Sequence, residues 1–312
     1  MRARLLPALF AFLTLGAPAA AQTTAPMPPR VGGYVQVRES YVEPTRLTAT
    51  LNRARFSLDG SLPARFSYRF LVELEADAGP RTAGAVSLRE AIARWSAAPY
   101  AIQAGQFKTP FSREYLIPVP ALETPDFAAV VDTLAPKYDI GVMGEYSIPM
   151  LTLSAGVFNG EGQNAGLNRD STVLAVARLG VRPLPQAILA GSLARYSADS
   201  LRYGADVTLE QSGVMVRGEV LGQRKRGRPR DDFGWYALAT CRVVTWLQLV
   251  AKQEDFQRPS LGQARRISAT TVGVNVELPG GRTRILLAAV SRAAGFPRVR
   301  RNTAISQLQL RF

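Results

Sequence analysis

Arginine and lysine side chains at regularly spaced positions are the residues of this sequence that could do chemistry. The chain carries a formal net charge of +14 at pH 7. Arginine stays charged at every pH that a cell meets, and it holds phosphate or carboxylate through two parallel hydrogen bonds. The positions that we predict to contact anions, from the strand pattern described below, are Arg53, Arg55, Arg65, Arg69, Lys108, Arg113, Arg178, Arg242 and Lys252. The chemistry that such a set offers is the recognition of anions.

The sequence contains no histidine, which removes most alternatives. Ser-His catalysis, histidine general-base chemistry and most zinc sites need that residue. We therefore expect no enzyme, no catalytic residue, no metal and no cofactor. A barrel enzyme such as an outer-membrane phospholipase or protease is the rival class, and it would need a histidine-assisted site. Nucleic acid is not an expected partner, because the arginines are spread along the chain and are not gathered in one run.

The N-terminus has the pattern of an export signal. Arg2 and Arg4 form a positive start, residues 5–15 form an apolar core, and Ala19-Ala20-Ala21 form a small-residue cleavage site. We predict a signal peptide over residues 1–21 and one transmembrane domain over residues 22–312. No apolar run of eighteen residues follows, so helical membrane spans are not expected. A single cysteine, Cys241, excludes an internal disulfide framework.

Apolar and polar residues alternate along most of the mature chain, which predicts strands. In the clearest segment, 64–77, Phe66 and Phe70 fall on one face, whereas Arg65, Arg69 and Glu73 fall on the other. We expect strands near 31–41, 47–59, 64–77, 84–95, 101–108, 139–147, 151–159, 172–182, 187–197, 203–212, 214–222, 233–243, 246–256, 266–278, 283–293 and 301–312. The fold predicted is all-β: a transmembrane antiparallel β-barrel of about sixteen strands, an even number as a closed barrel requires.

The links between these strands alternate in length. The even-numbered links are short, and the odd-numbered links are longer on the whole, among them 77–84, 109–140, 160–171, 222–232 and 257–265. Outer-membrane barrels have short periplasmic turns and longer extracellular loops. The third of these loops carries five prolines and several apolar residues, so we expect it to pack and not to be disordered. We predict that residues 109–138 fold into the lumen as a constriction loop.

Strand parity suggests which cations face the lumen. It places Arg53, Arg55, Arg65 and Arg69 on the lumen face of the second and third strands, and Lys108 where the long loop begins. Arg178, Arg242 and Lys252 lie opposite the apolar faces of their strands, and Arg113 lies in the loop itself. For the four arginines, bracing of the wall by acidic neighbours is an equally good interpretation. For Lys108 the alternative is a strand-end pair with Glu114.

Several fragments resemble the phosphate-selective porin O/P family. They include residues 53–60, residues 105–112 with Glu114, residues 157–162, 217–220 and 234–236, and the final Arg311-Phe312. The resemblance implies a bacterial outer-membrane porin, commonly a homotrimer, that passes small anions such as phosphate. It also implies that Phe312 is the signal read by the barrel-assembly machinery.

The charge inventory departs from the phosphate-selective pattern. Lysine occurs only at positions 108, 137, 225 and 252, and the long loop is net acidic. We therefore expect passive diffusion of small solutes through a water-filled channel with weak anion preference. A structural or adhesive barrel with a plugged lumen is the alternative. The other expected partner is outer-membrane lipid. The basic segment 222–232 could bind lipopolysaccharide phosphates or be a solvated loop.

Overall fold

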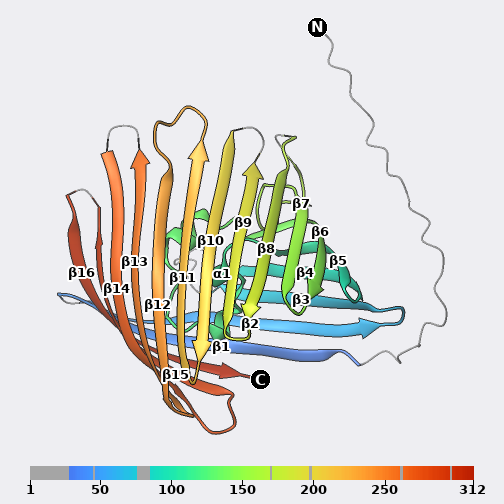
Figure 1. Cartoon of the computed structure of the whole chain (residues 1–312). Coiled ribbons are helices and arrows are strands. Elements are labelled where there is room, and N and C mark those ends of the chain that lie inside the picture. The colour runs from blue at the N-terminus through green and yellow to red at the C-terminus, as the bar shows by residue number, and fades with distance from the viewer. Residues whose placement is uncertain are drawn as a thin grey trace.

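The chain forms a closed barrel in which sixteen antiparallel strands pair with their sequence neighbours and β1 pairs with β16 (Figure 1). The computed structural model describes residues 28–44, 46–75, 85–168, 171–196, 199–260, 263–295 and 297–312. The predicted signal peptide, residues 1–21, lies outside the described residues. The strands are β1 (Arg30–Val42), β2 (Arg46–Leu62), β3 (Phe66–Glu75), β4 (Ala85–Ala97), β5 (Tyr100–Lys108), β6 (Tyr138–Ile148), β7 (Leu151–Phe158), β8 (Leu174–Leu184), β9 (Ala187–Tyr196), β10 (Ser200–Gln211), β11 (Val214–Lys225), β12 (Asp232–Val244), β13 (Leu247–Ser260), β14 (Gln263–Glu277), β15 (Thr283–Ala294) and β16 (Val299–Arg311).

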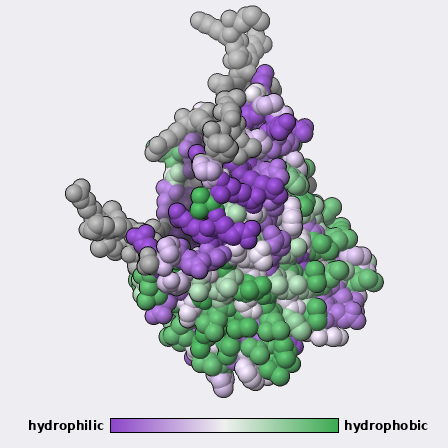
Figure 2. All heavy atoms as spheres, turned by 90° about the vertical axis from the view of Figure 1, so that its left-hand side faces the viewer, coloured by the Kyte–Doolittle hydropathy of each residue, from purple (hydrophilic) through white to green (hydrophobic). Residues whose placement is uncertain are grey.

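Period-two alternation separates the two faces of the wall. In β11, Met215, Arg217 and Glu219 are buried, whereas Val214 and Val216 are 46% and 45% exposed. Side chains in a strand alternate between the two faces of the sheet, so the exposed apolar residues form the outer surface of the barrel. Figure 2 views the side of the barrel that carries β13, β14 and β16, and it shows hydrophobic residues over the lower part with hydrophilic residues above them. An apolar outer band is what a barrel wall in contact with lipid requires.

All sixteen predicted strands are present, so the predicted fold class is confirmed. One expected long link, residues 257–265, is wrong. The ladder continues there through the pairs Gln257↔Arg266, Arg258↔Arg265 and Ser260↔Gln263. The polar residues that suggested a loop are thus part of the paired ends of β13 and β14. Arg65 is a second correction, because it lies in the β2–β3 turn at φ 68 and is exposed, outside β3 and off the lumen face. The alternation of apolar and polar residues continues through Arg65, so it did not show that the strand begins only at Phe66. A residue with a left-handed backbone conformation breaks the extended chain, and its side chain no longer follows the alternation.

The link between β5 and β6 is the largest and has structure of its own. It contains α1 (Arg113–Leu116), the 3₁₀ turn η1 (Val119–Ala121) and α2 (Ala129–Leu134). Its apolar residues join a buried cluster with inward side chains of the wall, such as Val131 with Tyr236 and Leu238. In Figure 1 the link lies within the ring of strands. Within the described residues, no helix is both long and apolar enough to cross a membrane.

Candidate functional site

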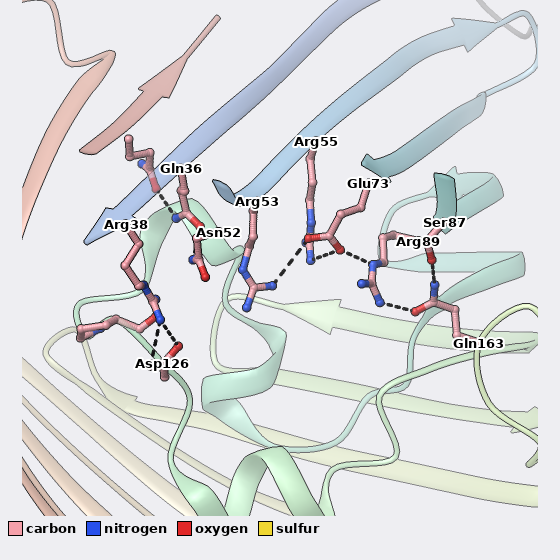
Figure 3. Close-up of polar contacts among 12 residues, drawn as sticks. Gln36, Arg38, Asn52, Arg53, Arg55, Glu73, Ser87, Arg89, Asp126 and Gln163 are labelled. Atoms are coloured by element: carbon pink, nitrogen blue, oxygen red, sulfur yellow. Dashed lines mark hydrogen bonds and ion pairs between the residues drawn. The ribbon is translucent and has the colours of Figure 1, made fainter. Parts of the chain in front are cut away.

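Four arginines point into the barrel from the wall formed by β1 to β4 (Figure 3). Arg38 comes from β1, Arg53 and Arg55 come from β2, and Arg89 comes from β4. Arg53 and Arg55 are two residues apart on one strand, so both point to the same side of the sheet. The structure therefore places these two predicted residues on the inner face.

Arg89 reaches the inner face through a β-bulge. Leu71 of β3 pairs with Glu90, but the next residue, Val72, pairs with Leu88, so Arg89 is the extra residue of β4. A bulge re-aims a side chain that strict alternation would send to the other face. Arg89 and Glu90 are consecutive in sequence and still both point inward, where they meet Glu73 and Arg69 respectively. Sequence reasoning missed Arg89 because it assumed unbroken alternation.

Glu73 of β3 is the carboxylate on which three of these arginines converge. Arg55 Nη2 lies 3.0 Å from Glu73 Oε2, Arg89 Nε donates to the same oxygen, and Arg53 Nη1 lies 4.0 Å from Oε1. Glu73 and Arg55 are both buried, with side chains 5% exposed. Three guanidinium groups thus gather around one carboxylate, and Gln163 is a further partner of Arg89. The Arg53 side chain is 24% exposed and makes the longest of the three contacts, so it is the member best placed to meet a solute.

Arg38 joins the wall to the loop. Its Nη1 lies 3.0 Å from Asp126 Oδ1, and its Nη2 donates to the carbonyl of Pro125 at 2.8 Å. Beside it, Gln36 and Asn52 form an amide network on the inner face, with Asn52 donating to Gln36 at 3.3 Å. The loop is therefore fastened beside Arg38, at one end of the row that runs through Arg53 and Arg55 to Arg89 (Figure 3).

Two predicted pore cations, Lys108 and Lys252, are bonded to the loop. Lys108 Nζ donates to the carbonyls of Tyr115 and Ile117 at 2.5 and 2.9 Å. Lys252 Nζ lies 3.0 Å from Glu114 Oε1, and its side chain is only 2% exposed. A buried ammonium whose bonds are all made to protein is not available to a passing anion. The bracing interpretation, offered above for the arginines, therefore fits both of these lysines.

Carboxylates complete the attachment of the loop to the wall. Glu219 of β11 accepts the backbone N–H groups of Arg113 and Glu114 at 2.9 and 3.2 Å. Glu114 in turn accepts the N–H of Ala128 at 2.7 Å, at the start of α2. Helix N-termini present N–H groups that have no partner within the helix, so acceptors at these points stabilise α1 and α2. Arg217 adds a two-pronged pair with Glu123, at 3.0 and 3.1 Å.

The remaining predicted residues are paired with acids, exposed at the rim of the barrel or, in the case of Arg113, next to a cavity. Arg69 is balanced by Asp59 and Glu90 at 2.9 and 2.8 Å, and Arg178 lies 2.7 Å from Asp206. Arg242 is exposed at the short-turn rim, where it donates to the carbonyl of Thr245.

Arg113 faces a cavity beneath the loop. Burial, followed by the nearby charge of Arg217, lowers the pKa of Arg113. Its guanidinium still stays charged at physiological pH.

The long-loop end of the barrel carries inward cations that sequence reasoning missed. Arg292 and Arg301 lie directly opposite one another on β15 and β16, as do Arg258 and Arg265 on β13 and β14. Like charges directly opposite one another destabilise a sheet. Among the described residues, no carboxylate lies within ion-pair distance of Arg292 or Arg301. Parity from the buried Leu286 and Gln307 would have placed both residues inside, but their like-charge pairing depends on the register.

Solved structures show the same fold. An anion-selective porin from Comamonas acidovorans matches with a TM-score of 0.72 and 10% identity, over 92% of this chain and 100% of that one. The outer-membrane channel DcaP of Acinetobacter baumannii matches at 0.70 and 12% identity, over 91% and 97%. The trimer form of OmpT from Vibrio cholerae matches at 0.68 and 11% identity, over 93% and 100%. No sequence among the curated proteins matches the chain.

A closed sixteen-strand barrel with an apolar outer surface, a charged interior and an internal loop defines the porin class of the bacterial outer membrane. The family model for the phosphate-selective porins O and P matches residues 33–186, just under half of the chain, and this part of the chain is similar to that family. The match contains the motifs at 53–60, 105–112 and 157–162, so the resemblance is confirmed there. The fragments at 217–220, 234–236 and 311–312 lie outside the matched residues.

Proposed function

We propose that this porin is a passive channel for small anions, with a weak preference for anions over cations. The convergence of Arg53, Arg55 and Arg89 on the single carboxylate of Glu73 is the observation that carries the proposal. Arg53 makes the longest contact with this carboxylate, 4.0 Å, and its side chain is 24% exposed, so its guanidinium is accessible to a solute. Charges that line the narrowest part of a pore set its selectivity.

The preference is weak because most of the interior is balanced. Lys108 and Lys252 are bonded to the loop, and Arg69 and Arg178 are paired with acids. A single partly exposed guanidinium such as that of Arg53 can attract any small anion, so we propose no particular advantage for phosphate. The structural neighbour from Comamonas acidovorans is an anion-selective porin, which supports the sign of the preference.

The inward cations at the long-loop end support the same proposal. Arg292 and Arg301 would raise the local concentration of anions before they reach the arginine row, since a cleft lined by one sign of charge focuses the field. In this proposal, the attraction of anions offsets the cost of placing the like charges of Arg292 and Arg301 opposite one another.

A plugged barrel is the second candidate, and one observation favours it. The apolar residues of α2, including Val130 and Val131, pack in a cluster with inward residues of β11 to β13. That cluster closes part of the lumen. The arginine row on the opposite wall lies outside the cluster, and we propose that the water-filled path runs beside it.

We further propose that the chain is not an enzyme and that it assembles as a homotrimer. The absence of histidine supports the first statement. The trimer form of the Vibrio cholerae neighbour supports the second. Contacts of the outer wall with lipid, of residues 222–232 with lipopolysaccharide, and of Phe312 with the assembly machinery belong to the same proposal.

Purified, refolded protein in a planar bilayer tests the channel. The wild type should give stepwise currents, and Arg53→Gln should lower the ratio of chloride to potassium permeability. Arg228→Gln removes the same charge from the exposed β11–β12 link and is the matched control, which should leave the ratio unchanged. No current steps from the wild type, or equal effects of both substitutions, would contradict the proposal.

A further inference from the structure

We infer that a cavity on the short-turn side of the loop binds organic carboxylates that carry an apolar body. The cavity has a volume of about 680 Å³ and lies between α1 and the inner faces of β6 to β9. Pockets of ~300–1,000 Å³ are the size that holds small organic molecules. It is separate from the arginine row of β1 to β4, and its occupancy does not require that ions pass through the barrel.

Two cations of this cavity are available to a ligand. Arg113 lines it from α1, and Arg182 lines it from the end of β8. Neither guanidinium has an ion pair with any residue that the structure describes. The Nε of Arg113 is buried and lacks a hydrogen-bond partner among these residues. A buried donor without a partner costs free energy, and a ligand carboxylate that accepted from the guanidinium of Arg113 would compensate for part of it.

The other charged groups at the cavity already have hydrogen-bond or ion-pair partners in the protein. Lys108 is bonded to loop carbonyls, and Arg178 is paired with Asp206. The carboxylate of Glu145 lies 2.9 Å from Arg94 Nη2. Arg113 and Arg182 therefore give the cavity positive charge that no carboxylate of the described residues pairs with.

Apolar side chains face the same space. Met143 lines the cavity from β6, Leu116 from α1 and Ile188 from β9. Burial of apolar surface against these residues favours a ligand in proportion to the area removed from water. Inorganic phosphate has no apolar surface to bury, whereas a phenyl- or alkyl-substituted carboxylate has both groups that the cavity matches. The ligand class is thus an amphipathic monocarboxylate.

Binding can be measured without any current. We would follow the ¹⁹F NMR signal of a trifluoromethyl-substituted 3-phenylpropionate with the full-length, refolded protein in detergent, against empty micelles. The wild type should broaden and shift the signal in a saturable way, and unlabelled 3-phenylpropionate should compete. Acetate, phosphate and 3-phenylpropanol should each compete at least about tenfold more weakly, because each lacks one of the two matching groups.

Substitutions locate the site. Arg113→Gln and Met143→Gln should each weaken binding by about tenfold, as expected for losing one charge-assisted contact or one buried apolar contact. Arg113→Lys keeps the charge and should restore most of the affinity. Arg228→Gln on the exposed link is the control, and it should bind as the wild type does. Unchanged elution and thermal stability would show that the variants are folded.

Three outcomes would overturn the inference: no saturable binding, equal competition by phosphate, or equal affinity of Arg113→Gln and the control. The current measurements test the channel, and their outcome is independent of the NMR test of the cavity. A wild type that conducts chloride but does not bind the probe would remove this site and leave the channel intact. A wild type that binds the probe but shows no current would keep the site and remove the channel.

Discussion

The ammonium of Lys252 on β13 lies 3.0 Å from a carboxylate oxygen of Glu114 in the loop, and both side chains are almost fully buried. The same ammonium donates to the hydroxyl of Thr124 and the carbonyl of Asp126. A strand residue and a loop residue 138 positions apart are thus joined inside the barrel. The contact fixes the loop against β13, as Arg38 fixes it against β1.

Breaking this pair on one side should destabilise the loop. Lys252→Met leaves the Glu114 carboxylate buried without its cation, which costs ~3–5 kcal/mol. The urea midpoint of unfolding, followed by tryptophan fluorescence in lipid vesicles, should fall. Adding Glu114→Gln to Lys252→Met should recover part of the loss, because no unpaired charge then remains buried. Equal midpoints for the single and double variants would show that the two groups are not coupled.

Lys108→Met should change the steadiness of the current more than its selectivity. The substitution removes two hydrogen bonds to the carbonyls of Tyr115 and Ile117 that hold α1 near the wall. Single-channel recordings should therefore show more current noise, while the chloride-to-potassium permeability ratio stays near that of the wild type. A large shift of that ratio with no added noise would return Lys108 to the role of an anion contact.

The opposed arginines at the long-loop end should act through long-range attraction. The double variant Arg292→Gln with Arg301→Gln should reduce anion preference at 0.1 M salt, where the Debye length is ~10 Å, and much less at 1 M, where it is ~3 Å. Zero-current potentials at the two salt levels measure the effect. The variant should also be slightly more stable, because opposed like charges are removed from the sheet. A loss of preference that is equal at both salt levels would argue against this role.

Phe312 should matter for closing the barrel. Its N–H and carbonyl form hydrogen bonds with Gly33 at 3.1 and 3.0 Å, and its ring lies 5.5 Å from that of Phe56. Phe312→Ala keeps the backbone bonds and removes the ring. We expect slower and less complete folding into membranes in cells, measured by the heat-modifiable band on gels, with Leu310→Ala as the neighbouring control. If both variants assemble equally well, the terminal ring is not a specific signal.

The sixteen strands could be predicted because each one shows alternation strongly enough to survive boundary errors. The places where prediction failed are those where a strand departs from regularity. Arg89 enters the interior through a bulge, and Arg65 leaves the strand through a left-handed turn residue. Neither event has a signal in the alternation of single residues.

The sequence also did not predict which cations are bonded to the loop and which are accessible to a solute. Lys108 and Lys252 look like pore residues from parity, but their partners are loop atoms that only the folded chain brings near. Arg53 has the same parity and a different role, because its nearest carboxylate is already shared with Arg55 and Arg89. Parity gives the face of a side chain, whereas its accessibility depends on the path of the long loop.

The zero-current potential of the wild-type channel in a potassium chloride gradient tests the central claim most directly. The partly exposed guanidinium of Arg53, beside the proposed water-filled path, predicts a potential displaced toward the chloride equilibrium potential, by an amount that shrinks in Arg53→Gln. A potential displaced toward the potassium equilibrium potential would contradict the account.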